Sequence, residues 1–357
     1  MGVNIEVATP ERGPKCVDDF PFKVWRYPET AEGRRFYLGG MSQFVRIGLR
    51  LRGLAKHVPL ATYDLVHATH LFDIEVMALR SHWRRQRYIV TVHGTEILFL
   101  ATARHRSGML QPFQWPVRVV TNSLYTRGLL LREFPKTKAA SARAVPLGVG
   151  RFWLQPEEGG PSFRASHGVA QDQYLVLSVN RIEPRKGNHV VIDALSLLPE
   201  GLRSRITYIV IGEPASWAES YAAGLSEHAR ESGVTLRLLG RLSDREVRAA
   251  YAASDIFCLA GVPQTDRIEG FGLVFLEAAG QGVPSIGTRV GGVPEAVIDG
   301  VTGCLVSPND KRSLSRTISR LLTHPTLRKQ LGSAAQKRAQ ELTWGKIASA
   351  TYEGLIM

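Results

Sequence analysis

The stretch Arg267–Ala296, RIEGFGLVFLEAAGQGVPSIGTRVGGVPEA, holds two widely spaced carboxylates and several glycine-rich turns around one apolar run. Glu269 comes directly before Gly270 and Gly272, and glycines let a backbone approach a ligand closely. From Leu273 the sequence LVFLEAA contains no helix breaker. We therefore expect a glycine-containing loop that leads into a helix.

The start of this expected helix is suited to bind an anion. Its first backbone amides have no partner inside the helix, and they lie at the positive end of the helix dipole. A helix start behind a glycine-containing loop is a natural phosphate site. Glu277 lies little more than one turn further on, at about 1.5 Å of rise per residue. Glu269 and Glu277 could therefore grip separate parts of one extended ligand, such as a diphosphate with a sugar on each side.

The continuation of the stretch adds two further motifs in order. GVPSIGT predicts a short strand, and GGVPEAV predicts a turn into another helix. With these motifs in place, the stretch resembles the Glu-seven residues-Glu signature of the retaining family 4 glycosyltransferases. The resemblance implies an α/β protein of the GT-B architecture, with two doubly wound Rossmann-like domains that face each other across a cleft. In that family a strand, a Gly-rich loop and a helix come first, and we expect them to precede Met1.

The composition is that of an ordinary globular protein. At 357 residues, with 44% hydrophobic and 22% charged residues, the chain suits two domains with their own cores. No apolar run approaches the roughly 20 residues that span a bilayer, and no secretory signal is visible. Cys16, Cys258 and Cys304 are far apart and match neither a disulfide framework nor a metal site. We therefore expect a cytoplasmic protein.

The positive charge is concentrated in the first part of the chain. Residues 1–150 hold 22 Lys and Arg against 11 Asp and Glu, whereas the remainder holds 23 against 21. A basic amphipathic helix is expected from Ser42 to His57, and the run Ser81–Tyr88 interleaves arginines with aromatics. These features are compatible with contact between the first domain and the anionic inner face of a membrane, and equally with a basic surface that is exposed to solvent. No helix-turn-helix, zinc or aromatic RNA-binding motif occurs, so we expect no nucleic-acid partner.

Residues 1–150 are expected to form the acceptor-side domain. Its strands are predicted at Val3–Ala8, Phe22–Tyr27, Asp64–His67, Tyr88–His93, Val117–Asn122 and, with a closing loop, within Ala144–Gly150. His93 ends a strand, and ligands of doubly wound sheets bind outside the carboxyl ends of strands. The resemblance implies that His93 and Gly94 lie beside the sugar donor on the acceptor side. His67 and His70 have no accompanying carboxylate or thiol cluster, so we expect strand-end residues there.

Residues 151–335 are expected to form the nucleotide-sugar-binding domain, and the stretch Gln155–Gly168 near its start is expected to be the linker between the domains. The alternation of strands and helices predicts a parallel sheet. Arg181 and Lys186 follow the predicted strand Tyr174–Asn180, where two cations could neutralise a leaving diphosphate or remain surface charges. Residues 336–357 resemble a terminal helix that crosses back onto the first domain.

The resemblance assigns roles to individual residues. Arg181 and Lys186 would hold the donor diphosphate, Glu269 would bind sugar hydroxyls, and Glu277 would accept hydrogen bonds from the ribose. The remaining donor-binding residues would be Arg241 and Leu242 beside the base, and Gly270, Phe271, Gly272 and Leu273 around the sugar and phosphate. Catalytic roles would fall on His93, Arg181, Lys186 and Glu269.

The implied reaction is transfer of a hexose from a UDP- or GDP-linked sugar to an acceptor hydroxyl, with retention of the anomeric configuration. The acceptor would be a glycan, a glycolipid or a small glycoside. No Asp-x-Asp motif is placed to hold Mg²⁺, so we expect no metal requirement and no cofactor besides the nucleotide sugar. The alternatives are a nucleotide-sugar epimerase, a sugar phosphorylase, or an inactive relic that still binds sugar nucleotides.

Overall fold

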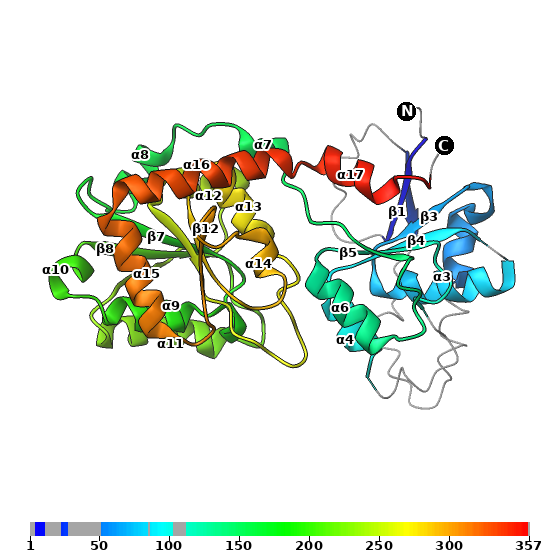
Figure 1. The fold of residues 1–357 in the computed structure, drawn as a ribbon, viewed down its shortest axis with the longest axis horizontal. Helices are drawn as coiled ribbons and strands as arrows, with labels where there is room; N and C mark the ends of the chain where they lie inside the picture. Colours follow the sequence, from blue (N-terminus) through cyan, green and yellow to red (C-terminus); the bar gives the residue numbers. More distant parts are fainter. Residues whose placement is uncertain (1–3, 11–22, 28–50, 85, 103–111, 356–357) are drawn as a thin grey trace. The chain divides into compact units, whose positions relative to one another are not determined.

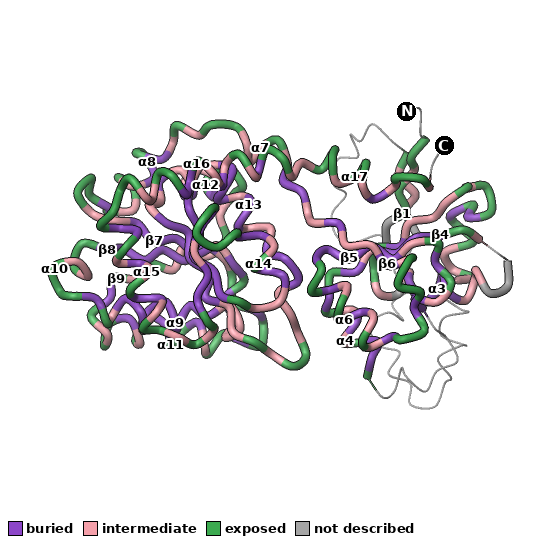
Figure 2. Tube along the Cα trace, viewed as in Figure 1, coloured by how far each residue is buried: buried purple, intermediate pink, exposed green. Residues whose placement is uncertain are grey.

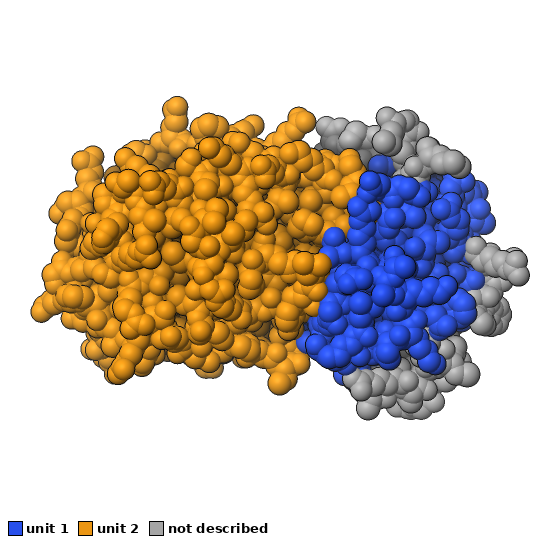
Figure 3. Space-filling view, in the orientation of Figure 1, with its two compact units in different colours: residues 1–121, 127–144, 352–357 blue, residues 122–126, 145–351 orange. Residues whose placement is uncertain are grey.

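The computed structural model describes residues 4–10, 23–27, 51–84, 86–102 and 112–355. The chain divides into two compact units (Figure 3). Unit 1 comprises residues 1–121, 127–144 and 352–357, and unit 2 comprises residues 122–126 and 145–351. The sequence-based domain limits were 150 and 335, so the observed units differ from them mainly at the carboxyl-terminal end.

Unit 1 contains a four-stranded parallel sheet in the order β3-β4-β5-β6, and a separate parallel pair, β1-β2. The strands are β1 (Glu6–Pro10), β2 (Lys23–Tyr27), β3 (Val66–Ala68), β4 (Tyr88–Val92), β5 (Arg118–Thr121) and β6 (Ala142–Ala144). Its helices include α3 (Leu71–Arg84), α4 (Thr95–Leu100) and α6 (Leu124–Glu133), and the first residues of α6 belong to unit 2. Strand β4 is the most apolar strand, and four of its five residues are buried.

Two predictions about this unit differ from the structure or lie beyond it. The closing strand β6 comes earlier than the expected Ala144–Gly150, because Pro146 has no amide to donate to a ladder. Most of the basic helix expected from Ser42, like Cys16, lies outside the described residues, although residues 51–57 are helical. None of the helices in the described parts of the chain is long and apolar enough to cross a membrane.

Unit 2 is built on a six-stranded parallel sheet in the order β12-β11-β10-β7-β8-β9. The strands are β7 (Tyr174–Val179), β8 (Ile206–Ile211), β9 (Thr235–Leu238), β10 (Ile256–Leu259), β11 (Ser285–Thr288) and β12 (Gly303–Val306). The chain order reverses between β7 and β10, which are paired neighbours. Such a reversal is the point at which doubly wound sheets bind ligands, outside the carboxyl ends of the strands.

Helices cover both faces of this sheet (Figure 1). One face carries α7 (Arg151–Leu154), α8 (Gly160–Ser166), α12 (Asp244–Ala253), α13 (Leu273–Gly280), α14 (Val293–Ala296) and α16 (Pro325–Glu341). The other carries α9 (Asn188–Ser196), α11 (Glu219–Glu231) and α15 (Lys311–Thr323). The short α10 (Glu200–Arg203) follows α9, and α17 (Trp344–Tyr352) follows α16.

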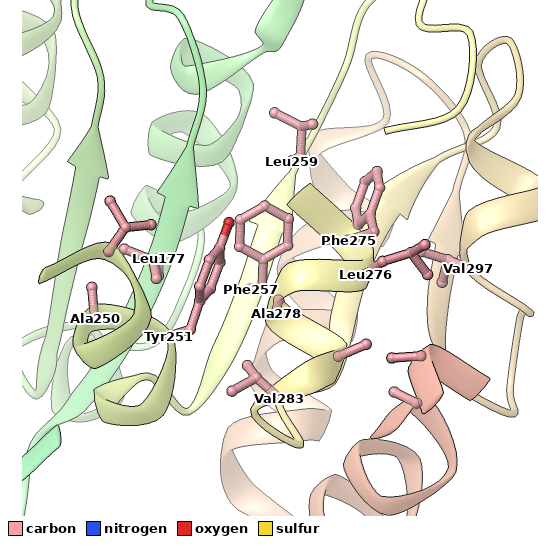
Figure 4. Packing of buried hydrophobic residues seen from close by; sticks show 14 of the residues in the cluster. Leu177, Ala250, Tyr251, Phe257, Leu259, Phe275, Leu276, Ala278, Val283 and Val297 are labelled. Carbon is pink, nitrogen blue, oxygen red and sulfur yellow. The ribbon is translucent and has the colours of Figure 1, made fainter. Parts of the chain in front are cut away.

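The strands divide their side chains between two cores. Leu175 and Leu177 of β7 pack toward α12 and α13, whereas Val176 packs toward α9 and α15. Because successive strand residues point to opposite faces, the uninterrupted apolar strands fill both cores at once. Figure 2 shows these strands as the buried centre of unit 2, and Figure 4 shows the first core from close by.

The predicted linker Gln155–Gly168 was wrong, because it contains helix α8. Phe163 on this helix is only 6% exposed and belongs to the first core. Arg164 Nη1 donates to the carbonyl oxygen of Ala253 at 2.7 Å, which joins α8 to the end of α12. Phe163 and Arg164 therefore contribute to docking a segment whose composition is that of a loop.

Candidate functional site

The loop after β7 lies against the end of β10. It makes a 3₁₀ turn at Pro184–Lys186 and ends at Gly187, whose φ is +72°. A Cβ atom at Gly187 would lie 1.8 Å from the carbonyl oxygen of Ala260, so only glycine fits there. This contact places the cations of the loop at the point where the chain order reverses.

Lys186 and Glu269, both predicted from the sequence as site residues, meet at this point. Lys186 Nζ lies 2.5 Å from Glu269 Oε2, and Arg185 Nη1 lies 3.3 Å from the same oxygen. All three side chains are less than one-fifth exposed. The structure therefore adds Arg185 to the site. Its position beside Lys186 was the available signal, but the sequence does not tell which way it points.

A buried carboxylate, Glu183, contacts Arg185 of this cluster. Glu183 is fully buried, with Arg185 Nε 2.7 Å from its Oε1 and Arg267 Nη1 3.3 Å from its Oε2. The shorter contact is an ion pair without hydrogen-bond alignment. Because an unpaired buried charge is costly, Glu183 and its two arginines stabilise one another. Glu183 was not predicted from the sequence, since an acidic residue in a polar loop is typical of a protein surface.

The backbone of Glu269 is fixed by the second glycine-rich turn. The amide of Gly292 donates to the carbonyl oxygen of Glu269 at 2.9 Å. A Cβ atom at Gly292 would lie 1.9 Å from the carbonyl oxygen of Gly270, and one at Gly291 would lie 2.1 Å from that of Glu269. The EGFG and GGVPE turns therefore form one close-packed unit, which explains why both need glycines.

Helix α13 begins directly behind the EGFG turn, as predicted. Its N-cap is Gly272, with φ of +94°, a value that favours glycine. The side chain of Phe271 is buried in the core, so only its backbone can face a ligand. Within the described part of the chain, no hydrogen bond involves the amides of Leu273 or Val274. These amides are the donors that an anion would use.

Glu277 lies on the same helix and faces α12. It accepts a hydrogen bond of 3.0 Å from the Tyr251 hydroxyl at Oε2. Burial raises the pKa of the Glu277 carboxyl to about 7, the Tyr251 hydrogen bond opposes this rise, and the charge of Asp244 adds to it. The carboxyl group is therefore poised between two protonation states near neutral pH.

Arg181 and Arg241 are exposed, and their side chains make no ion pair with the described residues. Leu242 is half-buried and packs against the first core of unit 2. Among the described residues, no hydrogen bond or ion pair joins these three residues to the Glu269 carboxylate, whose partners are Arg185 and Lys186. The loop after β9, which carries Arg241 and Leu242, is tied to the loop after β8, since the amide of Gly212 donates to the carbonyl oxygen of Gly240 at 2.8 Å.

Unit 1 holds the predicted acceptor-side residues. His93 is exposed directly after β4, and Gly94, with φ of +119°, forms the N-cap of α4. The Glu96 carboxylate accepts hydrogen bonds from the amides of His93 at 3.1 Å and Gly94 at 3.0 Å. The turn at this corner is therefore fixed by its own side chain, which leaves the imidazole of His93 at the surface.

His67 is held at both ring nitrogens. Nδ1 lies 2.7 Å from the hydroxyl of Tyr352, and Nε2 lies 2.7 Å from the hydroxyl of Thr91. Burial, together with a smaller contribution from the charge of His93, lowers the pKa of His67 to about 4. His67 is therefore neutral at pH 7. In the described residues, no group of three His, Cys, Asp or Glu could hold a metal ion.

The carboxylate of the GGVPE motif, Glu295, had no role predicted from the sequence. Glu295 accepts hydrogen bonds from the amides of Leu124 at 2.7 Å and Tyr125 at 3.0 Å. These three residues all belong to unit 2. Glu295 therefore caps the start of α6, a contact between positions far apart in the sequence that no local pattern reveals.

Comparisons with known proteins identify the family of the chain. The family model of glycosyl transferases group 1 matches residues 161–338, and that of glycosyltransferase family 4 matches residues 1–150. The chain belongs to the family 4 glycosyltransferases, which are transferase enzymes of the GT-B fold.

Curated relatives include D-inositol 3-phosphate glycosyltransferases. The one from Streptomyces scabiei is 31% identical over 66% of this chain and 53% of its own length. The one from Actinosynnema mirum is 36% identical over 58% of this chain and 49% of its own length. The chain thus spans about half the length of these relatives.

Solved structures show the same fold. The Anabaena protein HepE, in complex with UDP and glucose, has a TM-score of 0.73 and 20% identity, over 94% of this chain and 86% of that chain. Sucrose-phosphate synthase from Thermosynechococcus elongatus has a TM-score of 0.76 and 21% identity, over 98% and 88%. The predicted GT-B class with two Rossmann-like domains is confirmed.

Proposed function

We propose that this protein transfers a hexose from a nucleotide diphosphate sugar to an acceptor hydroxyl, with retention of the anomeric configuration. The observation that carries the proposal is the pairing of Lys186 with Glu269 at the reversal point of the unit 2 sheet. A cation for a phosphate and a carboxylate for sugar hydroxyls stand there side by side. A sugar diphosphate carries a phosphate and sugar hydroxyls next to each other, so it matches this pair of protein groups.

The costly event in such a reaction is the departure of the nucleoside diphosphate. We assign the stabilisation of its charge to Lys186, to the exposed Arg181, and to the amides at the start of α13. Donor binding would draw Lys186 toward the phosphates and free a Glu269 oxygen for the sugar. Arg185 stays anchored by buried Glu183 and keeps Glu269 in place during this exchange.

The nucleoside would occupy the surface between α12 and α13. Glu277 would accept hydrogen bonds from the ribose hydroxyls, as the family resemblance implies. The half-buried Leu242 would offer an apolar surface to the base, with the exposed Arg241 beside it. His93 and Gly94 of unit 1 would serve the acceptor side.

A binding panel tests the proposal on the purified chain. Calorimetry with UDP, GDP and ADP, each free and linked to a sugar, should find one nucleotide that binds selectively. Glu277→Ala should weaken that binding, whereas Lys311→Ala, which removes an exposed cation on α15, should not. Absence of binding by every member of the panel would overturn the proposed function.

The acceptor search then follows the donor. D-inositol 3-phosphate belongs in the acceptor panel, because the curated relatives carry it in their names. Lipid-linked saccharides and small glycosides complete the panel, and product anomers should be read by NMR. Formation of an epimerised free sugar without any acceptor would instead identify an epimerase.

We also propose that the segment of residues 1–150, through its Lys and Arg side chains, binds an anionic membrane surface from the cytoplasmic side. The net charge of +11 on this segment supports this, and binding of that kind weakens with salt. Flotation with vesicles that contain anionic lipid should carry the protein at low salt, whereas neutral vesicles should not. Equal flotation with both would contradict the proposal.

A further inference from the structure

Tyr251 is a fully buried tyrosine on α12 whose ring is fixed by aromatic neighbours. Its ring centroid lies 5.7 Å from that of Phe257 and 6.0 Å from that of Trp153, both edge to face. Figure 4 shows the ring standing beside Phe257 within the first core. Edge-to-face packing on two sides leaves the ring little freedom, so the position of its hydroxyl is fixed as well.

Within the described part of the chain, the Tyr251 hydroxyl forms one hydrogen bond, which it donates to the Oε2 atom of Glu277 at 3.0 Å. Burial raises the pKa of Tyr251 well above its usual range, and the charge of Glu277 raises it further. The phenol is therefore always a donor at working pH. The other charged group that acts on Glu277 is Asp244, at the start of the same helix α12, which repels its carboxylate.

We propose that Tyr251 is a positioning residue for the binding of the nucleotide-sugar donor. Its hydroxyl holds the Glu277 carboxylate so that the remaining acceptor sites of this carboxylate meet the ribose hydroxyls. This inference rests on the proposed function. A carboxylate has about four lone-pair sites, and a single phenol uses one of them. The other sites stay available for a ligand that arrives from outside the core.

A pH dependence of donor binding follows from this arrangement. Ribose hydroxyls donate to the charged carboxylate, so binding favours loss of the Glu277 proton. The pKa of the Glu277 carboxyl in the protein without donor is about 7. The affinity for the donor should therefore fall as pH falls below 7, by up to about tenfold per pH unit. Removal of the Tyr251 hydroxyl removes an influence that lowers this pKa, so the midpoint of the profile should move to higher pH.

The test uses the variant Tyr251→Phe, which keeps the ring and removes only the hydroxyl. The ligand is the nucleotide sugar selected by the panel, whose diphosphate is esterified at both ends and does not titrate near neutral pH. We expect about tenfold weaker binding at pH 7, the size of one lost hydrogen bond to a charged group, and partial recovery at about pH 8.5.

Tyr88→Phe is the matched control. Tyr88 is equally buried, but it lies in unit 1 and its hydroxyl is 3.5 Å from the carbonyl oxygen of Pro112. This variant should keep the wild-type pH profile even if it is less stable. A Tyr251→Phe protein with native thermal stability and an unchanged profile would overturn the inference, as would the same shift in Tyr88→Phe.

Two further measurements keep the inference separate from the proposed function. With the wild-type protein, the 2′-deoxyribose form of the donor should bind more weakly and lose most of the pH dependence. This comparison decides the matter if Tyr251→Phe does not fold, and an unchanged pH profile with the deoxy donor would then refute the inference. If no donor binds at all, the proposed function fails. NMR of the Glu277 carboxyl carbon then tests whether Tyr251→Phe raises its pKa, and no rise would overturn the positioning role.

Discussion

The Nζ atom of Lys186 lies 2.5 Å from Oε2 of Glu269, so the two groups assigned to the donor neutralise each other in the free protein. Arg185 contacts the same carboxylate oxygen, and buried Glu183 anchors Arg185. The cluster is therefore ordered before any ligand arrives. Under the proposed function Lys186 moves to the phosphates when the donor binds, while Arg185 and Glu183 keep Glu269 in place, so this carboxylate needs no rearrangement when the diphosphate departs.

Loss of the Lys186 charge should mainly slow turnover. We expect Lys186→Ala to lower kcat by about 10²- to 10³-fold, because it removes one preorganised charge that acts on the leaving group. Steady-state kinetics with a saturating donor would measure this. Lys311→Ala is the control. Lys311 lies on α15, half-exposed, with its Nζ atom 3.5 Å from Oδ2 of Asp193 on α9, and both helices cover the sheet face opposite to α13. Equal kcat values for the two variants would contradict the assigned role.

Glu277→Gln should stabilise the protein at alkaline pH while it weakens donor binding. The folded-state pKa of about 7 lies above the ordinary value of 4.5, so the native state holds a proton that the unfolded chain has lost. Stability should therefore fall as pH rises from 4.5 to 7, by on the order of 3 kcal/mol. Thermal unfolding should show the variant more stable at about pH 8 and unchanged at about pH 4. A variant less stable at both pH values would refute this account.

His67 should act in the opposite direction. Its folded-state pKa of about 4 lies below the ordinary 6.5, so the folded protein resists protonation at this site. The stability contribution is complete above pH 6.5 and is lost as pH falls toward 4, by on the order of 3 kcal/mol. His67→Gln can keep hydrogen bonds to Thr91 and Tyr352 but cannot titrate. Its unfolding free energy should depend less on pH in this window, and an identical slope in both proteins would speak against the prediction.

The close-packed glycine turns should not tolerate a methyl group. Gly292→Ala would place its Cβ atom 1.9 Å from the carbonyl oxygen of Gly270, so the backbone would have to move. We expect a loss of at least about 2 kcal/mol in the free energy of unfolding, together with weaker donor binding. Gly224→Ala on α11 meets no atom within 4 Å and should instead stabilise by about 0.5–1 kcal/mol. Denaturant titration of both variants checks the contrast, and similar effects would rule out the clash.

Chelation should leave transfer intact. The diphosphate charge is assigned to Arg181, Lys186 and the amides at the start of α13, and these groups need no metal bridge. Activity after dialysis against EDTA should therefore equal activity before it. Complete loss that Mg²⁺ or Mn²⁺ restores would show that a bound ion shares this task.

The strands and helices of unit 2 were predictable because local pattern and burial agree there. The predicted strand Tyr174–Asn180 and helix start Leu273 match β7 and α13 closely, since uninterrupted apolar runs and glycine punctuation are strong signals. The linker was wrong because the docking of α8 depends on Phe163, whose partners are distant in the sequence. Composition alone does not reveal such a tertiary contact.

In the candidate site too, some residues were predicted from the sequence and others are known only from the structure. Lys186, Glu269 and Glu277 were predicted from motifs, and the structure adds the residues that hold them: Arg185, Glu183 and Tyr251. These supporting residues interact across positions that are far apart in the sequence or point inward from loops. Their roles therefore follow from geometry and not from spacing.

Tyr352, which ends α17, contacts His67 of β3, so the carboxyl end of the chain returns to unit 1 after building unit 2. Unit 1 is consequently discontinuous, and no single proteolytic cut can excise it from the chain. A fragment that ends at position 351 would leave Nδ1 of a half-buried histidine without its partner. Expression of unit 1 by itself would require the last residues to be fused back, whereas unit 2 consists of one continuous segment, residues 145–351, and the short segment 122–126.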